Sequence, residues 1–331
     1  MHGLIHIGTE KTGTTSIQEF INKNTQNFNK NNIKTLKSFG KYSQSSLCIF
    51  GINTNRSQVY KNNFSLNNKT DIHSKRKELS LLLGNELSKF NHDDSVLISS
   101  EHLHSLLQTK EEILNFKKAL ILHGVKTFKI IIFLRPHADL YVSRISTIFK
   151  SGFISNLPGA SYPWSNHSPP HLYKYKKSLK TWIEAFSDDE VSVNKYSKNI
   201  VENFLESIDE HANDYNLSTK YKNKPLSPEY MHALYMARNQ LNSKFRNKND
   251  LKKFIHRFSN NEYIKSNSNR IAISTQIKDK FNINFKEDIN FIQKKYNFSI
   301  QSNSKIDGCH KINKEHMEKI YKMILKKIDS N

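Results

Sequence analysis

The sequence contains few cysteines and no long apolar segment. Its 331 residues include 2 cysteines, Cys48 and Cys309, whereas a secreted disulfide scaffold carries more of them at closer spacing. Cys309 and His310 could form half of a metal site, but nothing else at ligand spacing supports one, so we expect no metal. The longest apolar stretch, Phe128–Leu134, is much shorter than the roughly 18 apolar residues of a membrane-spanning helix.

We also expect no signal peptide, because the segment Met1–Gly8 is too short and too mixed in character for one. We therefore expect a cytoplasmic protein without a transmembrane segment. Acidic residues are outnumbered, since 51 Lys and Arg against 30 Asp and Glu give a formal net charge of +21. This charge favours an anionic ligand or partner and is compatible with peripheral contact with a membrane surface. No long basic run occurs, so we expect no specific nucleic-acid partner.

Strands alternate with helices over roughly the first two thirds of the sequence, which predicts a parallel α/β sheet. The apolar stretch at 127–134 is typical of a central strand that is covered on both faces. The expected strands are 3–8, 33–37, 95–99, 127–134 and 191–193. The expected helices are 14–24, 73–90, 111–123, 137–150, 173–186 and 199–208. The two expected long loops are 40–70 and 151–172.

Beyond residue 212 the sequence changes in character and predicts only helices, near 228–242, 274–296 and 313–328. The first of these begins with Ser227 as N-cap and Pro228 at the first helical position. We therefore predict an α/β protein in which residues 1–212 form a three-layer α/β/α core around a central parallel sheet of about five strands. Residues 213–331 are expected to form a helical C-terminal subdomain that packs on this core.

Residues 8–15, with the sequence GTEKTGTT, join the first expected strand to the first expected helix. At such a helix N-terminus, free backbone N–H groups and the helix dipole favour a phosphate. Gly8 and Gly13 have the spacing of the nucleoside-triphosphate loop G-x-x-x-x-G-K-[ST]. However, the residue after Gly13 is Thr14, where that loop has a lysine.

The lysine of the loop is instead Lys11, inside it. The strongest expected strand ends in Arg135 rather than in an acid that could help to hold magnesium. These two departures indicate a loop that binds a single phosphate, with a lysine near its far side.

From Lys11 to Ser16 the sequence is KTGTTS. Here it resembles the sulfotransferase superfamily, whose members bind the sulfate donor PAPS (3′-phosphoadenosine 5′-phosphosulfate) through a K-[TS]-G-[ST]-[TS] loop after the first strand. The resemblance covers roughly residues 3–210 and is to bacterial carbohydrate and polysaccharide sulfotransferases. It implies a P-loop-like fold and a loop that contacts the donor's 5′-phosphate through Lys11, Thr12, Gly13, Thr14, Thr15 and Ser16.

A second element of that family is an Arg at a strand end with a Ser eight residues later. Arg135 and Ser143 have this spacing, and the resemblance implies that both bind the donor's 3′-phosphate. An Arg guanidinium forks onto phosphate oxygens, and a Ser two helical turns further on adds a hydrogen bond. The resemblance also implies an adenine contact for Tyr196. Further candidates, for stacking on a sugar or for closing over the donor, are Trp164, Arg270 and Lys305.

The resemblance also implies a mechanism and a base. Sulfuryl transfer is an in-line displacement at sulfur, in which Lys11 would stabilise the leaving phosphate and no metal is required. Glu101 best matches the family's base after the preceding strand, and His102 and His104 are near enough in sequence to compete with it. The implied acceptor is a hydroxyl or amine of a carbohydrate, such as a surface polysaccharide or glycolipid precursor, in a cleft flanked by the two long loops.

Two other functions remain open from the sequence. The first is a nucleotide kinase that uses ATP and magnesium through a degenerate triphosphate loop. The second is a basic nucleic-acid-binding protein without enzymatic activity, whose binding would depend steeply on salt.

Overall fold

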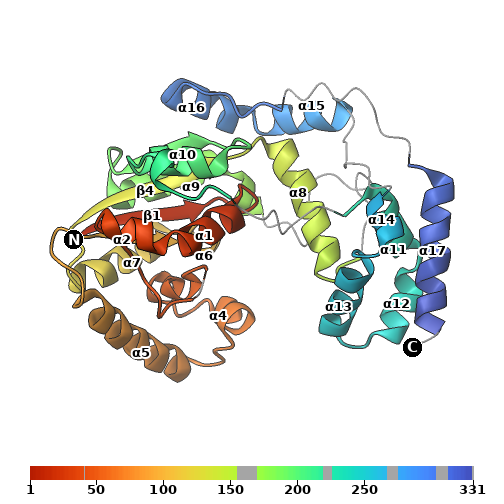
Figure 1. Cartoon of the computed structure of the whole chain (residues 1–331), viewed down its shortest axis with the longest axis horizontal. Coiled ribbons are helices and arrows are strands. Elements are labelled where there is room, and N and C mark those ends of the chain that lie inside the picture. The colour runs from red at the N-terminus through yellow and green to blue at the C-terminus, as the bar shows by residue number, and fades with distance from the viewer. Residues whose placement is uncertain (41, 155–169, 219–225, 267–274, 303–311, 330–331) are drawn as a thin grey trace. The chain divides into compact units, whose positions relative to one another are not determined.

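A five-stranded parallel sheet with the order β2-β3-β1-β4-β5 lies at the centre of the first part of the chain. The computed structural model describes residues 1–40, 42–154, 170–218, 226–266, 275–302 and 312–329 (Figure 1). The strands are β1 (His2–Gly8), β2 (Ile33–Thr35), β3 (Ser95–Ser99), β4 (Thr127–Leu134) and β5 (Val191–Lys195). All five were expected from the sequence, although β2 ends earlier and β5 ends later than the pattern indicated.

The central strands are held by buried apolar side chains on both faces of the sheet. Every residue from Ile130 to Leu134 in β4 is fully buried, which explains why these five residues are all apolar. β1 pairs with β3 and β4, so the chain segments that follow these three strands leave the same edge of the sheet. Loops at this edge are where α/β proteins bind their ligands.

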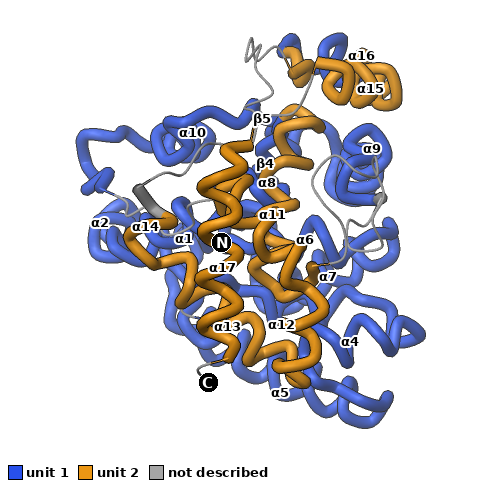
Figure 2. The backbone as a smooth tube through the Cα atoms, turned by 90° about the vertical axis from the view of Figure 1, so that its right-hand side faces the viewer, with its two compact units in different colours: residues 1–135, 171–221, 291–298 blue, residues 136–170, 222–290, 299–331 orange. Residues whose placement is uncertain are grey.

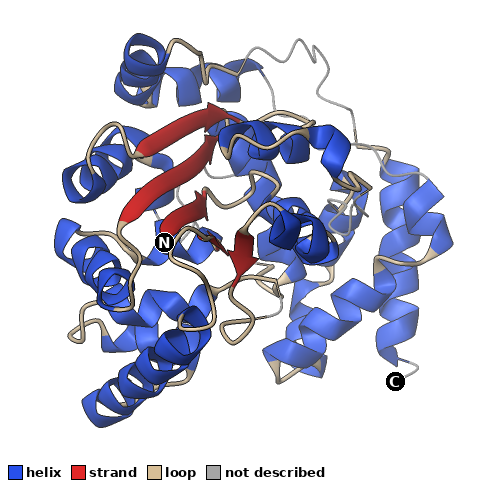
Figure 3. Ribbon diagram, turned by 60° about the vertical axis from the view of Figure 1, so that its left-hand side comes forward, coloured by secondary structure: helices blue, strands red, loops and turns tan. Residues whose placement is uncertain are grey.

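Helices cover the sheet on both sides, as the three-layer prediction requires (Figure 3). On one side, α1 (Thr14–Lys23) and α10 (Ile200–Ser207) share a core with Leu4, Leu97 and Phe133 of the strands. On the other side, α7 (Lys110–Leu122) and α9 (Tyr175–Phe186) pack on the sheet, where the rings of Phe128 and Phe186 meet at 5.2 Å. The α/β/α fold class is thus confirmed.

The expectation of a long loop or insertion at 40–70 is wrong in part, because this segment contains the short helices α3 (Cys48–Gly51) and α4 (Ser57–Phe64). The buried Tyr60 anchors α4, since its hydroxyl donates to the carbonyl of Ile52 and accepts from Arg76 Nη2 at 3.0 Å. The remaining helices of this part are α2 (Thr25–Lys30), α5 (Lys69–Leu87) and α6 (Glu101–Leu106).

The chain divides into two units (Figure 2). The first comprises residues 1–135, 171–221 and 291–298, and the second comprises 136–170, 222–290 and 299–331. The helices of the second unit are α8 (His137–Lys150), α11 (Pro228–Met236), α12 (Arg238–Lys244), α13 (Lys248–Phe258), α14 (Glu262–Ser266), α15 (Thr275–Asn284) and α17 (Lys314–Asp329), while α16 (Lys286–Tyr296) is shared between the two. The expected division at residue 212 stays a prediction.

Within the second unit, α17 packs along α11 and α12 through buried residues such as Ile320, Ile324 and Leu234. As expected, Ser227 caps α11 by accepting a hydrogen bond from the N–H of Tyr230. In the described part of the chain, every helix is too short or too polar to cross a membrane.

Candidate functional site

The loop between β1 and α1 turns sharply through three residues in the left-handed region. These are Gly8 (φ 107°), Lys11 (φ 66°) and Gly13 (φ 81°). Gly13 is the N-cap of α1, and a Cβ on it would lie 3.0 Å from Cγ2 of Ile200, so both its conformation and its surroundings favour glycine. The turn brings the chain into α1 without a capping side chain, as is required if the first N–H groups of the helix are to face a ligand.

Two threonines hold the loop in this conformation. The buried Thr9 donates from both its N–H (3.1 Å) and its hydroxyl (3.2 Å) to the carbonyl of Phe133 in β4. The buried Thr12 donates from its hydroxyl to the carbonyl of Thr9 at 2.6 Å. Thr12 therefore contributes to the shape of the loop. Thr14, the first residue of α1, is buried as well, whereas Thr15 is exposed.

Arg135 contacts the loop directly. Its Nη1 donates to the carbonyl of Lys11 at 3.0 Å, and its guanidinium carbon lies 4.9 Å from the centroid of the Tyr196 ring. The N–H of Tyr196 in turn donates to the carbonyl of Leu134 at 2.8 Å. The Nε atom of Arg135 is buried and has no hydrogen-bond partner. The structure thus brings three predicted site residues, Lys11, Arg135 and Tyr196, together at the carboxyl ends of the strands.

Tyr175, which the sequence analysis did not single out, also contacts this site. It is the first residue of α9, it is buried, and its hydroxyl donates to the carbonyl of Arg135 at 2.9 Å. Burial raises the pKa of Tyr175 well above its ordinary value, so the hydroxyl stays protonated. An aromatic residue at the start of an amphipathic helix resembles an ordinary core residue, so its sequence context carries no functional signal.

Glu101 lies beside the start of the loop. It is the first residue of α6, and its Cα would be 3.2 Å from a Cβ on Gly8. Its Oε2 accepts a hydrogen bond from Nε2 of Gln18, a buried residue of α1, at 2.8 Å. This hydrogen bond holds the Glu101 side chain against α1. Glu101 and Lys11 thus lie at the same edge of the sheet.

The two histidines near Glu101 differ in their surroundings. His102 is partly exposed, whereas His104 is buried and has no hydrogen-bond partner at either ring nitrogen. Burial lowers the pKa of His104 to about 4, His171 adds to this effect, and Glu10 opposes it. His104 is thus neutral at neutral pH. The choice of base among Glu101, His102 and His104 stays a prediction.

Ser143 lies on α8, in the second unit. Arg135 belongs to the first unit and directly precedes Pro136, where the second unit begins. The prediction that Arg135 and Ser143 bind one phosphate therefore stays a prediction. Three other predicted residues, Trp164, Arg270 and Lys305, lie outside the described residues, as do Cys309 and His310. Among the residues that the structure does describe, no three His, Cys, Asp or Glu side chains form a group that could hold a metal ion.

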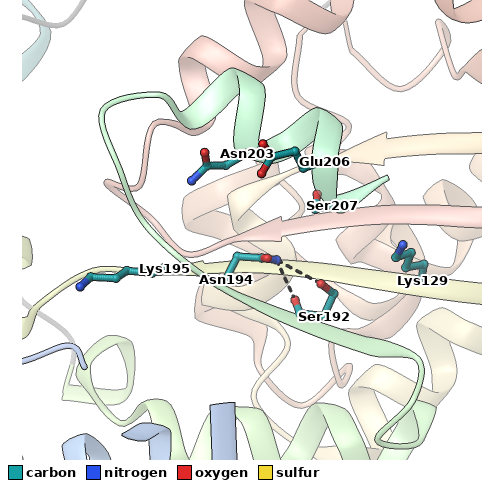
Figure 4. A pocket seen from close by; sticks show the side chains of 7 residues that line it. All are labelled: Lys129, Ser192, Asn194, Lys195, Asn203, Glu206 and Ser207. Atoms are coloured by element: carbon teal, nitrogen blue, oxygen red, sulfur yellow. Dashed lines mark hydrogen bonds between the residues drawn. The ribbon is translucent and has the colours of Figure 1, made fainter. Parts of the chain in front are cut away.

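A polar pocket of about 330 Å³ lies between α10 and the strands β4 and β5 (Figure 4). Most of its hydrogen-bonding groups already have partners within the protein. Asn194 donates to Oγ of Ser192 at 3.1 Å, and Lys129 pairs with Asp209 at 2.6 Å. The other lining residues are Lys195, Asn203, Glu206 and Ser207. We therefore place the candidate site at the loop and not in this pocket.

In comparisons with known proteins, no family model matches the chain, and no curated protein matches it.

Proposed function

We propose that the chain is a PAPS-dependent sulfotransferase that moves a sulfuryl group to a hydroxyl or amine of a carbohydrate acceptor. The observation that carries the proposal is the position of Arg135. Its guanidinium donates a hydrogen bond to the carbonyl of Lys11 and packs against the ring of Tyr196. At a strand–loop–helix turn, a lysine and an arginine can bind phosphate groups, and an aromatic ring can contact an adenine base.

The residues of the loop fit a phosphate group. The positive φ of Gly13 and the absence of a capping side chain leave the N-terminus of α1 open to an anion. The buried Nε of Arg135 is a charged donor without a partner, which an anionic ligand could supply. Thr14 and Thr15 would add hydroxyl and N–H donors to the 5′-phosphate, and Ser16, whose N–H donates to the carbonyl of Gly13, would add its hydroxyl. Arg135 and Ser143 would hold the 3′-phosphate.

PAPS would supply the sulfuryl group, the bond from sulfur to the bridging phosphate oxygen breaking as the acceptor oxygen or nitrogen bonds to sulfur. Lys11 would stabilise the negative charge left on the bridging oxygen. Glu101 would take the acceptor's proton, and its hydrogen bond from Gln18 would hold the carboxylate in place. The products are the sulfated acceptor and 3′,5′-adenosine bisphosphate.

Cellular context is part of the proposal. The small number of cysteines, with Cys48 buried and free, supports a cytoplasmic location. The net charge of +21 supports an anionic glycan, or a glycolipid precursor at a membrane surface, as acceptor. The spacing of Gly8 and Gly13 favours a second candidate, a nucleotide kinase that uses ATP and magnesium.

The test is transfer of labelled sulfate from PAPS to a panel of carbohydrate acceptors, with release of the bisphosphate followed in parallel. Lys11→Ala should lower transfer about 100-fold or more, whereas Lys30→Ala, which removes an exposed charge from the same unit, should leave it unchanged. Glu101→Gln should lower transfer but not donor binding. Phosphorylation of a nucleotide by ATP and magnesium, with no consumption of PAPS on any acceptor, would favour the kinase instead.

A further inference from the structure

The end of β4 and the loop after β1 are tied together by hydrogen bonds from both sides. On the loop side, the N–H and hydroxyl of Thr9 donate to the carbonyl of Phe133. On the strand side, Nη1 of Arg135 donates to the carbonyl of Lys11. Tyr175 adds a further bond at the strand end, since its hydroxyl donates to the carbonyl of Arg135 at 2.9 Å.

The position of Tyr175 makes its hydrogen bond to Arg135 a rigid one. Its side chain is 1% exposed and lies at the first turn of α9, whose next turns bury Leu179 and Trp182. A hydroxyl on a rigid ring that is anchored in the core fixes the atoms that it bonds to far better than a surface side chain would. Because the hydroxyl bonds to the backbone of Arg135, it sets the point from which the guanidinium reaches the loop.

We propose that Tyr175 is a positioning residue of the candidate site, which holds the backbone of Arg135 in place and, through the bond from Arg135 to Lys11, fixes the loop for an anionic ligand. The identity of the ligand rests on the proposed function, whereas the hydrogen-bonded link between the loop and β4 does not. Tyr175 touches neither donor nor acceptor in this account. It acts through Arg135.

The experiment compares Tyr175→Phe with Tyr60→Phe, a matched control in the same unit. Both variants remove a buried tyrosine hydroxyl that donates to a backbone carbonyl, but Tyr60 bonds to Ile52 and lies on α4. Two readouts are taken for each variant and for the unchanged protein. The first is hydrogen exchange of the amides of Thr9 and Tyr196, and the second is calorimetric affinity for 3′,5′-adenosine bisphosphate.

In Tyr175→Phe we expect both amides to exchange about tenfold faster and the bisphosphate to bind about tenfold more weakly, with neither change in Tyr60→Phe. These values correspond to the loss of one buried hydrogen bond. Unchanged exchange in Tyr175→Phe overturns the proposed link. Faster exchange with unchanged affinity overturns the positioning role.

The failure of the proposed function gives a different result. If the unchanged protein binds no bisphosphate, the donor assignment is wrong, and the exchange of the two amides alone decides whether Tyr175 fixes the loop. If Tyr175→Phe does not fold, the exchange of the Thr9 and Tyr196 amides in the unchanged protein decides: protection of both amides as strong as in the central strands supports the link, and rapid exchange of either overturns it.

Discussion

Acidification should destabilise the first unit through His6, a fully buried residue in the middle of the central strand β1. Its Nδ1 lies 2.8 Å from Oγ of Ser99, whereas its Nε2 has no hydrogen-bond partner. The ring stands edge-on against the rings of Phe133 and Phe204 at 5.8 and 5.7 Å. A second proton on the ring would have no hydrogen-bond acceptor at Nε2. Burial therefore lowers the pKa of His6 from 6.5 to about 3.

The sign and size of the effect follow from proton linkage. The folded pKa lies below the unfolded one, so the stabilising contribution is fully present above pH 6.5 and is lost as the pH falls toward about 3. Within this window the unfolded chain binds one more proton than the folded chain at this site. The free energy of unfolding therefore falls by about 1.4 kcal/mol per pH unit, or about 5 kcal/mol over the whole window.

Urea denaturation between about pH 7 and about pH 4.5 measures this loss. The comparison is with a double variant, His6→Leu with Ser99→Ala, which replaces the hydrogen-bonded pair with apolar side chains. His104 titrates in both proteins, so its contribution cancels in the difference. The unchanged protein should lose about 2 to 3 kcal/mol more than the double variant over this range. Equal losses in the two proteins would show that His6 does not carry the pH dependence.

Two further predictions concern stability away from His6. Glu112→Gln should cost about 3 kcal/mol in thermal or urea denaturation, because the buried carboxylate accepts from Nη1 of Arg56 at 2.7 Å and from three backbone N–H groups. The exposed pair of Lys75 and Glu78 is the control, and Glu78→Gln should cost less than about 0.5 kcal/mol. Gly13→Ala should cost about 2 kcal/mol, because an alanine at φ 81° is strained and its Cβ meets Ile200. Equal costs for the two glutamates, or no cost for Gly13→Ala, would contradict these assignments.

The sheet could be predicted because each strand has a local signature. The apolar stretch of β4 and the short apolar segments of β1 and β3 are bounded by polar or glycine residues, and burial on both faces requires such sequences. The contact between Arg135 and the loop also follows from this, since β1 and β4 are neighbours and end at the same edge. These features depend on chain order and periodicity, which the sequence contains.

Other features depend on tertiary contacts. The helix α4 lies in a polar segment, 40–70, that is rich in Asn and Ser. Its buried anchor, Tyr60, gains its partners from Ile52 and from Arg76 of α5. Tyr175 acquires its role only because α9 starts beside the end of β4. The helix α13 was not expected but could have been predicted from the sequence. Asn247 caps it, and its buried residues recur at helical spacing.

The central claim is that the loop and Arg135 bind a bisphosphorylated adenosine. Calorimetric titration with 3′,5′-adenosine bisphosphate, beside ATP with magnesium, tests it most directly on the unchanged protein, on Arg135→Ala and on the control Lys30→Ala. We expect clear binding of the bisphosphate, weakened at least about tenfold by Arg135→Ala and not by Lys30→Ala, and little binding of ATP. Strong ATP binding, or bisphosphate binding that Arg135→Ala leaves unchanged, would contradict it.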